Sequence, residues 1–193
     1  MAEILDEAYM REALELAKQA AALGEVPVGA VVVWDGEVVG RGYNRRETDK
    51  NALAHAELAA IGEACRKLDG WRLWKATLYV TLEPCPMCAG AIVNARIPRV
   101  VFGAADPKSG ACGSVTDLCG LPGGYHPKVE SGLLAEESSA LLAEFFQNLR
   151  GLRRRNGKYP VGEDARGIRP LPGPRLKNPP YRKPSQEAEC RNA

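Results

Sequence analysis

The stretch that decides the fold is Ala76-Thr-Leu-Tyr-Val-Thr-Leu-Glu-Pro-Cys-Pro-Met-Cys-Ala-Gly-Ala-Ile-Val-Asn-Ala95. Its first part, residues 76–81, is short and rich in β-branched and aromatic side chains, which predicts a strand. Residues 84–95 place prolines in the first turn and continue with small and apolar residues, which predicts a helix. A strand that leads directly into a helix is the building unit of an α/β domain.

The same two patterns recur on both sides of this unit. Apolar residues at helical spacing predict amphipathic helices, and β-branched runs predict strands. The expected helices cover residues 6–23, 55–68 and 136–149, and the expected strands cover residues 29–34, 37–43 and 99–104. Asp35-Gly36 joins the first two strands and suits a type I′ hairpin turn. A hairpin combined with strand–helix units predicts a three-layer α/β/α domain with a mixed central sheet.

The C-terminal segment differs in composition from the rest of the chain. The 193 residues, 45% of them hydrophobic, suffice for one domain with its own core. Residues 150–193 hold 12 Lys and Arg against 4 Asp and Glu, and residues 160–193 contain seven of the 14 prolines. We therefore predict one domain at residues 1–152 and a basic, proline-rich, disordered tail at residues 153–193.

Two features of the sequence bear on where the protein works. The first ten residues carry three acidic side chains and lack the basic start and apolar run of a secretory signal, and no apolar stretch is long enough to span a bilayer. We therefore expect a cytoplasmic protein without membrane contact. Six cysteines in a reducing compartment are expected to be free thiols, so they direct attention to metal binding or catalysis.

Three residues form a candidate metal site. His55 stands at the start of one expected helix, and Cys85 and Cys88 stand at the start of another. A catalytic zinc ion takes three protein ligands and leaves a fourth position for water, which one imidazole and two thiolates satisfy. The three-residue spacing places both sulfurs on one face of a helical turn, whose positive end favours thiolates. Cys85 and Cys88 alone would also fit a redox pair or a buried turn.

Glu57 adds a candidate proton-transfer group to this site. It lies two residues after His55, near enough to reach a water on the metal without binding the metal itself. A carboxylate there can take a proton from water and return it to a substrate, a contribution of roughly 10² to 10⁴ in rate. Together the four residues predict a hydrolytic zinc enzyme with Glu57 as its catalytic residue.

Longer blocks of sequence resemble a known family. His-x-Glu followed by Pro-Cys-x-x-Cys is the signature of zinc deaminases that act on cytosine or adenine. With it, Glu25-Val-Pro-Val-Gly-Ala30, Gly42-Tyr-Asn44, Ala54-His-Ala-Glu57 and Val101-Phe-Gly-Ala-Ala-Asp-Pro-Lys-Ser-Gly110 resemble the tRNA-specific adenosine deaminases of bacteria. The resemblance covers roughly residues 5–152. It implies a cytidine deaminase-like fold, one Zn²⁺ per subunit, a homodimer, and hydrolytic deamination of the wobble adenosine in the anticodon of an arginine tRNA to inosine, with release of ammonia.

The resemblance also implies a site for the tRNA anticodon stem-loop. Its base pocket falls on Val28, Asn44 and the backbone N–H of Ala56, and its channel for the anticodon loop falls on Asp106, Lys108, Phe145 and Phe146. A carboxamide such as Asn44 offers both a donor and an acceptor to a purine, and the adenosine must leave its stack to enter the pocket. Asn44 also fits a plain turn residue, and at most one of the two adjacent phenylalanines can face the core squarely.

Two other functions stay open at the level of sequence. A deaminase of free nucleobases or nucleosides, such as guanine, cytidine or adenosine, would share the metal site and differ only in its pocket. A non-catalytic RNA-binding protein with a structural zinc would keep the ligands without needing Glu57. The basic tail fits either an inert extension or a segment that attracts phosphate in a salt-dependent way.

Overall fold

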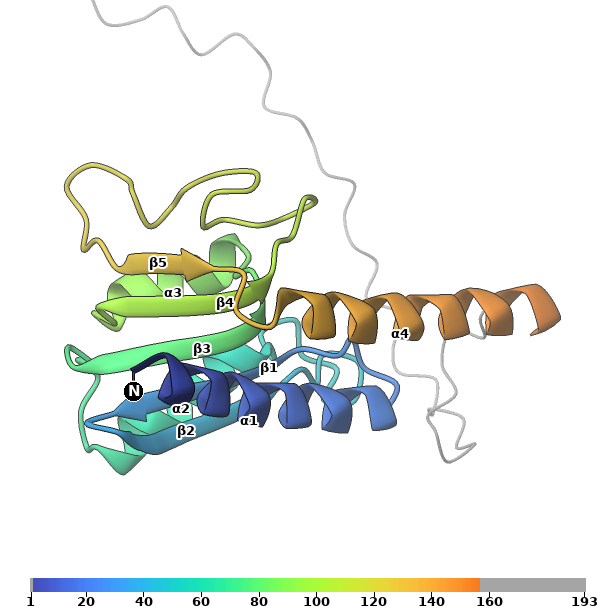
Figure 1. The fold of residues 1–193 in the computed structure, drawn as a ribbon, viewed down its shortest axis with the longest axis horizontal. Helices are drawn as coiled ribbons and strands as arrows, with labels where there is room; N and C mark the ends of the chain where they lie inside the picture. Colours follow the sequence, from blue (N-terminus) through green and yellow to red (C-terminus); the bar gives the residue numbers. More distant parts are fainter. Residues whose placement is uncertain (1, 157–193) are drawn as a thin grey trace, which may run out of the picture. The chain divides into compact units, whose positions relative to one another are not determined.

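A five-stranded sheet in the order β2-β1-β3-β4-β5 forms the centre of the protein (Figure 1). The computed structural model describes residues 2–156, with side chains described for residues 5–151. The strands are β1 (Gly29–Trp34), β2 (Glu37–Tyr43), β3 (Ala76–Leu82), β4 (Arg99–Ala104) and β5 (Lys128–Ser131). β1 pairs antiparallel with β2 and β3, whereas β3, β4 and β5 run parallel, so the sheet is mixed as predicted.

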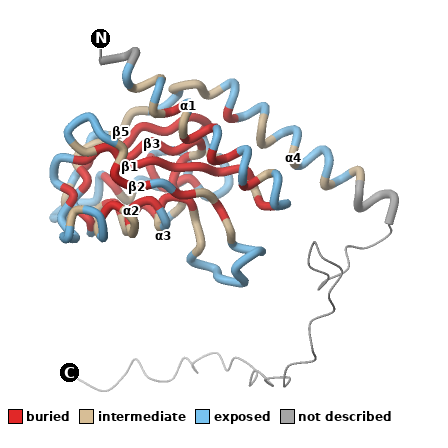
Figure 2. The backbone as a smooth tube through the Cα atoms, turned by 90° about the horizontal axis from the view of Figure 1, so that it is seen from below, coloured by how far each residue is buried: buried red, intermediate tan, exposed pale blue. Residues whose placement is uncertain are grey.

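Between residues 2 and 156, four helices cover the two faces of this sheet. α1 (Ala2–Ala22) and α4 (Ala135–Asn156) lie on one face, and α2 (Ala56–Lys67) and α3 (Pro86–Asn94) lie on the other (Figure 1). Met10 and Val31 belong to the apolar core on the first face, and Leu78 and Val100 belong to the larger core on the second. The sheet between them is buried along most of its length (Figure 2). The three-layer α/β/α prediction is confirmed.

The hairpin between β1 and β2 also follows the sequence prediction. Asp35 and Gly36 both have positive φ, 49° and 85°, as a type I′ turn requires. The register between the two strands shifts after Val32, where one extra residue, Val39, enters β2. Such a bulge increases the local twist of the hairpin.

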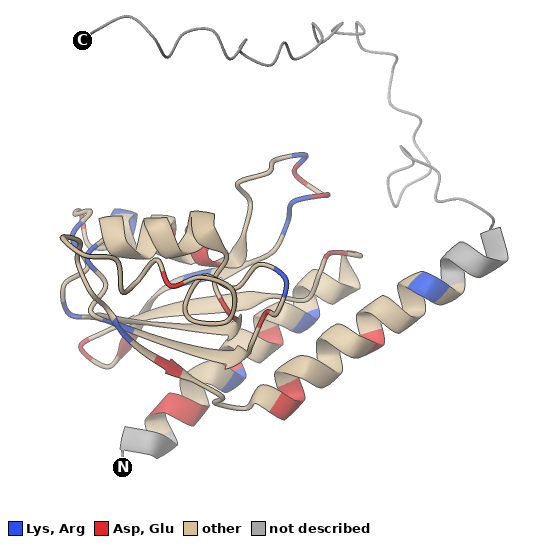
Figure 3. Cartoon of the chain, turned by 90° about the horizontal axis from the view of Figure 1, so that it is seen from above, with Lys and Arg blue, Asp and Glu red and all other residues tan. Residues whose placement is uncertain are grey.

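The last helix and the last strand differ from the sequence prediction. β5 was not expected, because its four residues carry no apolar run; its two end residues are exposed and its two middle residues are only half-buried. α4 continues to Asn156, so residues 153–156 of the predicted tail are helical, and residues 157–193 lie outside the described part of the chain. Within residues 2–156, no helix has both the length and the apolar character that a membrane crossing requires. Charged residues of both signs are spread over the helices and loops of the described part of the chain (Figure 3).

Two glycines of β2 set the position of α2. A Cβ at Gly40 would come within 2.1 Å of the carbonyl oxygen of Ala60, and a Cβ at Gly42 would come within 2.1 Å of that of Ala56. The helix can therefore lie directly on the strand only because both positions lack a side chain. Since α2 begins at Ala56, this contact also fixes the height of His55 above the sheet.

Candidate metal and substrate site

His55 and Cys85 occupy the same structural position on two different helices. His55 is the N-cap residue of α2 and Cys85 is the N-cap residue of α3, each with extended backbone. Neither side chain forms a capping hydrogen bond, so both remain available for other partners. Pro86 follows in the first turn of α3, where its missing N–H costs nothing. Cys88 sits one turn further on and is fully buried.

The donor atoms of these three residues lie at the separations that a tetrahedral metal site requires. His55 Nδ1 is 3.7 Å from Cys85 Sγ and 3.6 Å from Cys88 Sγ. Zinc bonds of about 2.3 Å to sulfur and about 2.05 Å to nitrogen, at a tetrahedral angle, give a sulfur–nitrogen separation of about 3.6 Å. Among the described side chains, this is the one group of three His, Cys, Asp or Glu residues close enough to share a metal ion. The site fits a metal of the zinc type in both donor chemistry and spacing.

The electrostatics of the protein groups favour a thiolate at this position. The pKa of Cys85 falls to about 4, because the Cys88 thiol and His55 both donate hydrogen bonds to its sulfur. The same hydrogen bond raises the pKa of Cys88. The hydrogen bond to Cys85 also raises the pKa of His55. A metal cation would stabilise the thiolate form of both sulfurs, since coordination favours deprotonated ligands.

Glu57 adds an ionisable group next to the metal ligands. It lies in the first turn of α2, with only 4% of its surface exposed. Burial raises the pKa of its carboxyl group. A carboxyl group at this position can both accept and release a proton, which is what general acid–base catalysis requires.

A cavity of about 140 Å³ joins the metal ligands to the predicted base pocket. Its lining includes His55, Glu57 and Cys85 from the site above. It also includes four residues predicted to bind substrate, namely Val28, Asn44, Ala56 and Asp106. The sequence prediction missed five further lining residues, Val26, Arg46, Leu82, Glu83 and Ser109. The structure therefore brings together segments from residue 26 to residue 109 around one small pocket.

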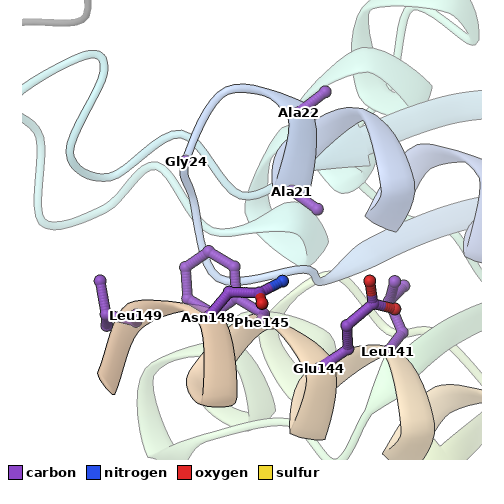
Figure 4. A pocket seen from close by; sticks show the side chains of 8 residues that line it. All are labelled: Ala21, Ala22, Gly24, Leu141, Glu144, Phe145, Asn148 and Leu149. Atoms are coloured by element: carbon purple, nitrogen blue, oxygen red, sulfur yellow. The ribbon is translucent and has the colours of Figure 1, made fainter. Parts of the chain in front are cut away.

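The other three predicted substrate residues lie outside this cavity. Lys108 is exposed, and its backbone N–H donates to Asp106 Oδ1 at 2.9 Å. Phe145 lines a separate cavity of about 420 Å³ between the end of α1 and α4, together with Leu141 and Leu149 (Figure 4). Phe146 is 39% exposed and packs edge-on against Phe145, with ring centroids 5.4 Å apart. The phenylalanine pair therefore does not line the pocket that contains the metal ligands.

Comparisons with known proteins show the family to which the chain belongs. The model of the MafB19-like deaminase family matches residues 4–150. The tRNA-specific adenosine deaminase of Bacillus subtilis (strain 168) is 53% identical over 146 residues, which are 75% of this chain and 91% of that protein. The chain belongs to the family of the tRNA-specific adenosine deaminases. The resemblance carried by the sequence motifs is thereby confirmed.

Solved structures place the fold in the same family. A structure from a study of A-to-I editing by tRNA:A34 deaminases at the wobble position of transfer RNA is 48% identical, with a TM-score of 0.68 over 70% of this chain and 99% of that chain. A guanine deaminase from Nitrosomonas europaea is 29% identical, with a TM-score of 0.58 over 72% and 83% of the two chains. The tRNA-specific adenosine deaminase family thus shares its fold with a guanine deaminase.

In this member of the tRNA-specific adenosine deaminase family, a buried glutamate that sequence reasoning missed holds one wall of the pocket. Glu83 is 2% exposed and accepts backbone N–H groups from Asp106, Cys112 and Ser114, each at 3.0 Å. Burial disfavours its charged form, yet hydrogen bonds from Ser114, Asp106 and Cys112 outweigh burial and lower the pKa of Glu83. The one signal in the sequence is an acidic residue directly after the apolar run of β3.

Proposed function

We propose that the protein catalyses the hydrolytic deamination of adenosine to inosine at the wobble position of a tRNA anticodon, that of an arginine tRNA, with release of ammonia. The observation that carries this proposal is the buried Glu57 beside a His–Cys–Cys donor group in one pocket. The tRNA assignment is supported by the 53% identity to a tRNA-specific adenosine deaminase.

The metal of this proposal is one Zn²⁺ per subunit, held by His55, Cys85 and Cys88. Two sulfurs and one imidazole nitrogen suit zinc better than magnesium or calcium, which prefer oxygen ligands. When bound, zinc supplies Lewis acidity that lowers the pKa of a coordinated water toward about 7. Cys88 is fully buried, whereas His55, Glu57 and Cys85 line the pocket.

Glu57 moves the protons of the reaction. As a carboxylate it takes a proton from the attacking water. It delivers that proton to a ring nitrogen of adenine, and it then moves a second proton from the hydroxyl group now bonded to the base to the departing amino group, which leaves as ammonia. Its burial strengthens these transfers, because few solvent molecules compete for the carboxylate.

The pocket binds the base, and the surrounding loops bind the RNA. A cavity of about 140 Å³ is smaller than the roughly 300 to 1,000 Å³ of drug-sized ligand sites, so it suits one extruded base. We assign base contacts to Val28, Asn44 and the backbone N–H of Ala56. We assign contacts with the anticodon loop to Asp106, Lys108, Phe145 and Phe146.

Two further parts of the proposal rest on the family alone. We propose a homodimer whose tRNA site spans both subunits, and a cytoplasmic location. Size-exclusion chromatography with light scattering measures the first. A homodimer has a measured molar mass of twice the 20.8 kDa of one chain. A molar mass equal to that of one chain at the working concentration contradicts the homodimer.

The second candidate function is deamination of a free nucleobase or nucleoside, which the likeness to a guanine deaminase favours. The deciding experiment offers the zinc-loaded protein an anticodon stem-loop with adenosine at the wobble position, beside free adenosine, cytidine and guanine. The proposal expects inosine in the stem-loop and negligible turnover of the free compounds. Turnover of a free compound alone overturns the tRNA assignment, and turnover of none favours a non-catalytic RNA-binding protein.

A further inference from the structure

Glu25 is a buried carboxylate next to the pocket that neither the metal site nor the predicted substrate site includes. It lies between α1 and β1 and is 1% exposed. Its Oε2 accepts a hydrogen bond from Asn44 Nδ2 at 3.3 Å and from the backbone N–H of Glu47 at 3.2 Å. Its Oε1 accepts one from the backbone N–H of Thr48. The adjacent residue, Val26, lines the pocket itself.

These bonds hold the loop that leads to the metal ligand. The loop runs from Asn44 at the end of β2 to His55 at the start of α2. It is closed by a hydrogen bond of 3.0 Å between the backbone N–H of Arg45 and the carbonyl of Ala54. One carboxylate therefore fixes both the side chain that begins the loop and the backbone turn within it.

The bond to Asn44 also decides which end of its carboxamide is free. A carboxylate only accepts hydrogen bonds, so the amide nitrogen of Asn44 must face Glu25. Among the residues that the structure describes, no group donates to Asn44 Oδ1. Asn44 lines the pocket, and its oxygen is consequently the atom available there as an acceptor.

We infer that Glu25 is a positioning residue for substrate recognition: it orients Asn44 so that the carboxamide oxygen accepts a hydrogen bond from the substrate. This inference rests on the proposed function. The ring nitrogens of adenine are acceptors, so the partner of this oxygen is the exocyclic amino group or a ribose hydroxyl. Glu25 does not touch the substrate and acts only through Asn44.

Reversing the polarity of the pair tests this role. In Glu25→Gln, the carboxylate that fixes the amide of Asn44 is lost. In Asn44→Asp, two carboxylates face each other in a buried position. In the double variant, the glutamine amide donates to the aspartate, and the second oxygen of the aspartate again offers an acceptor to the pocket. Glu25→Gln leaves the polarity of the pair undefined and Asn44→Asp leaves it without a donor, whereas the double variant again has one donor facing one acceptor.

The experiment measures kcat/KM on an anticodon stem-loop with full-length, zinc-loaded protein. Each single variant is expected to lose about 10- to 100-fold, as for a lost hydrogen bond to a charged group. The double variant is expected to regain at least about tenfold over the poorer single variant. Glu15→Gln is the matched control, because Glu15 lies exposed on α1 with its side chain 66% accessible, and it should keep wild-type activity.

Two results overturn the inference. One is a Glu25→Gln variant within twofold of the wild type. The other is a double variant no better than the poorer single variant, which would leave Glu25 only a support for the loop backbone. Zinc content and thermal unfolding are measured on every variant. If Glu25→Gln alone loses zinc or its fold, the activities of Asn44→Asp and of the double variant are compared instead. The inference requires the double variant to be more active than Asn44→Asp.

A measurement on the wild-type protein distinguishes a failure of this inference from a failure of the proposed function. Its turnover of the stem-loop, free adenosine, cytidine and guanine is measured first. If it converts only a free compound, the tRNA assignment fails. The four-variant comparison is then run on that compound, where rescue in the double variant supports the role of Glu25 and its absence overturns it.

Discussion

A methyl group added at Gly42 of β2 should displace α2, the helix that carries Glu57 in its first turn. In Gly42→Ala, the new Cβ would lie 2.1 Å from the carbonyl oxygen of Ala56 and 2.7 Å from the backbone nitrogen of Ala60. Both atoms belong to the backbone of α2, so no side-chain rotation relieves the contact. Because Ala56 stands between His55 and Glu57, the displacement reaches the metal ligand and the proton-transfer group together.

The size of the effect follows from the distances. Real Cβ contacts below 3.0 Å are essentially absent from proteins, so the helix must retreat by about 1 Å. Overpacking of this kind costs about 1 to 3 kcal/mol of stability. A misplacement of about 1 Å at a catalytic site costs on the order of 10²-fold in rate. We therefore expect Gly42→Ala to be about 2 kcal/mol less stable and roughly 100-fold slower.

Gly62→Ala on the same helix provides the matched control. Its new Cβ would meet only the tip of the Arg66 side chain, at 3.5 Å. Replacing glycine by alanine inside a helix stabilises it by about 0.8 to 1 kcal/mol. Urea unfolding gives the stability of both variants, and stem-loop deamination gives the rate. If Gly42→Ala matches the wild type in both, or if the two variants lose equally, the reasoning about helix placement is wrong.

Three further changes have defined outcomes. Cys88→Ala should lose the bound metal and unfold at a lower temperature, because metal binding contributes to folding free energy; full zinc content by mass spectrometry would contradict this. Hydrogen bonds from Arg99 and Lys128 hold the pKa of Glu130 at about 2, below its ordinary 4.5, so its contribution to stability is complete above pH 4.5 and is lost as pH falls toward 2. The stability difference between the wild type and Glu130→Gln should accordingly shrink from pH 5 to pH 2, and a constant difference in acid unfolding would refute the assignment. Phe146→Ala should keep the fold and raise KM for the stem-loop severalfold, whereas an unchanged KM would remove Phe146 from the proposed RNA contacts.

Most of the sheet could be predicted because its strands are buried on both faces. Residues 30–33 and 78–80 are continuous apolar runs, and such runs have few interpretations when turn residues bound them. β5 escaped prediction because it pairs only with β4 at the edge of the sheet and keeps two of its four residues exposed. Its formation depends on the pairing offered by β4, which no local pattern records.

The metal site could be predicted because its chemistry is encoded in short spacings. His55 precedes Glu57 by two residues, and Cys85 precedes Cys88 by three. Glu25 and Glu83 left no such signal, since their partners are backbone N–H groups that lie 22 to 31 residues away in the chain and, for Glu25, also the side chain of Asn44, 19 residues away. Their roles emerge only when the loops they anchor are folded.

The direction of a side chain on a surface helix was the least predictable feature. Two adjacent phenylalanines on α4 were expected at the RNA channel, and the structure places Phe145 in a cavity beside the end of α1 (Figure 4). Which side of a helix faces which neighbour depends on tertiary packing. The contact of Phe145 and Phe146 with the anticodon loop stays a prediction.

The most direct test of the metal-and-glutamate account is one preparation of Glu57→Gln assayed for zinc, fold and deamination. The account predicts about one zinc per chain, wild-type thermal unfolding and a loss of roughly 10² to 10⁴ in the rate of inosine formation. Full activity with the carboxylate removed, or loss of the metal together with the activity, would contradict the separation between His55, Cys85 and Cys88 as ligands and Glu57 as the group that moves protons.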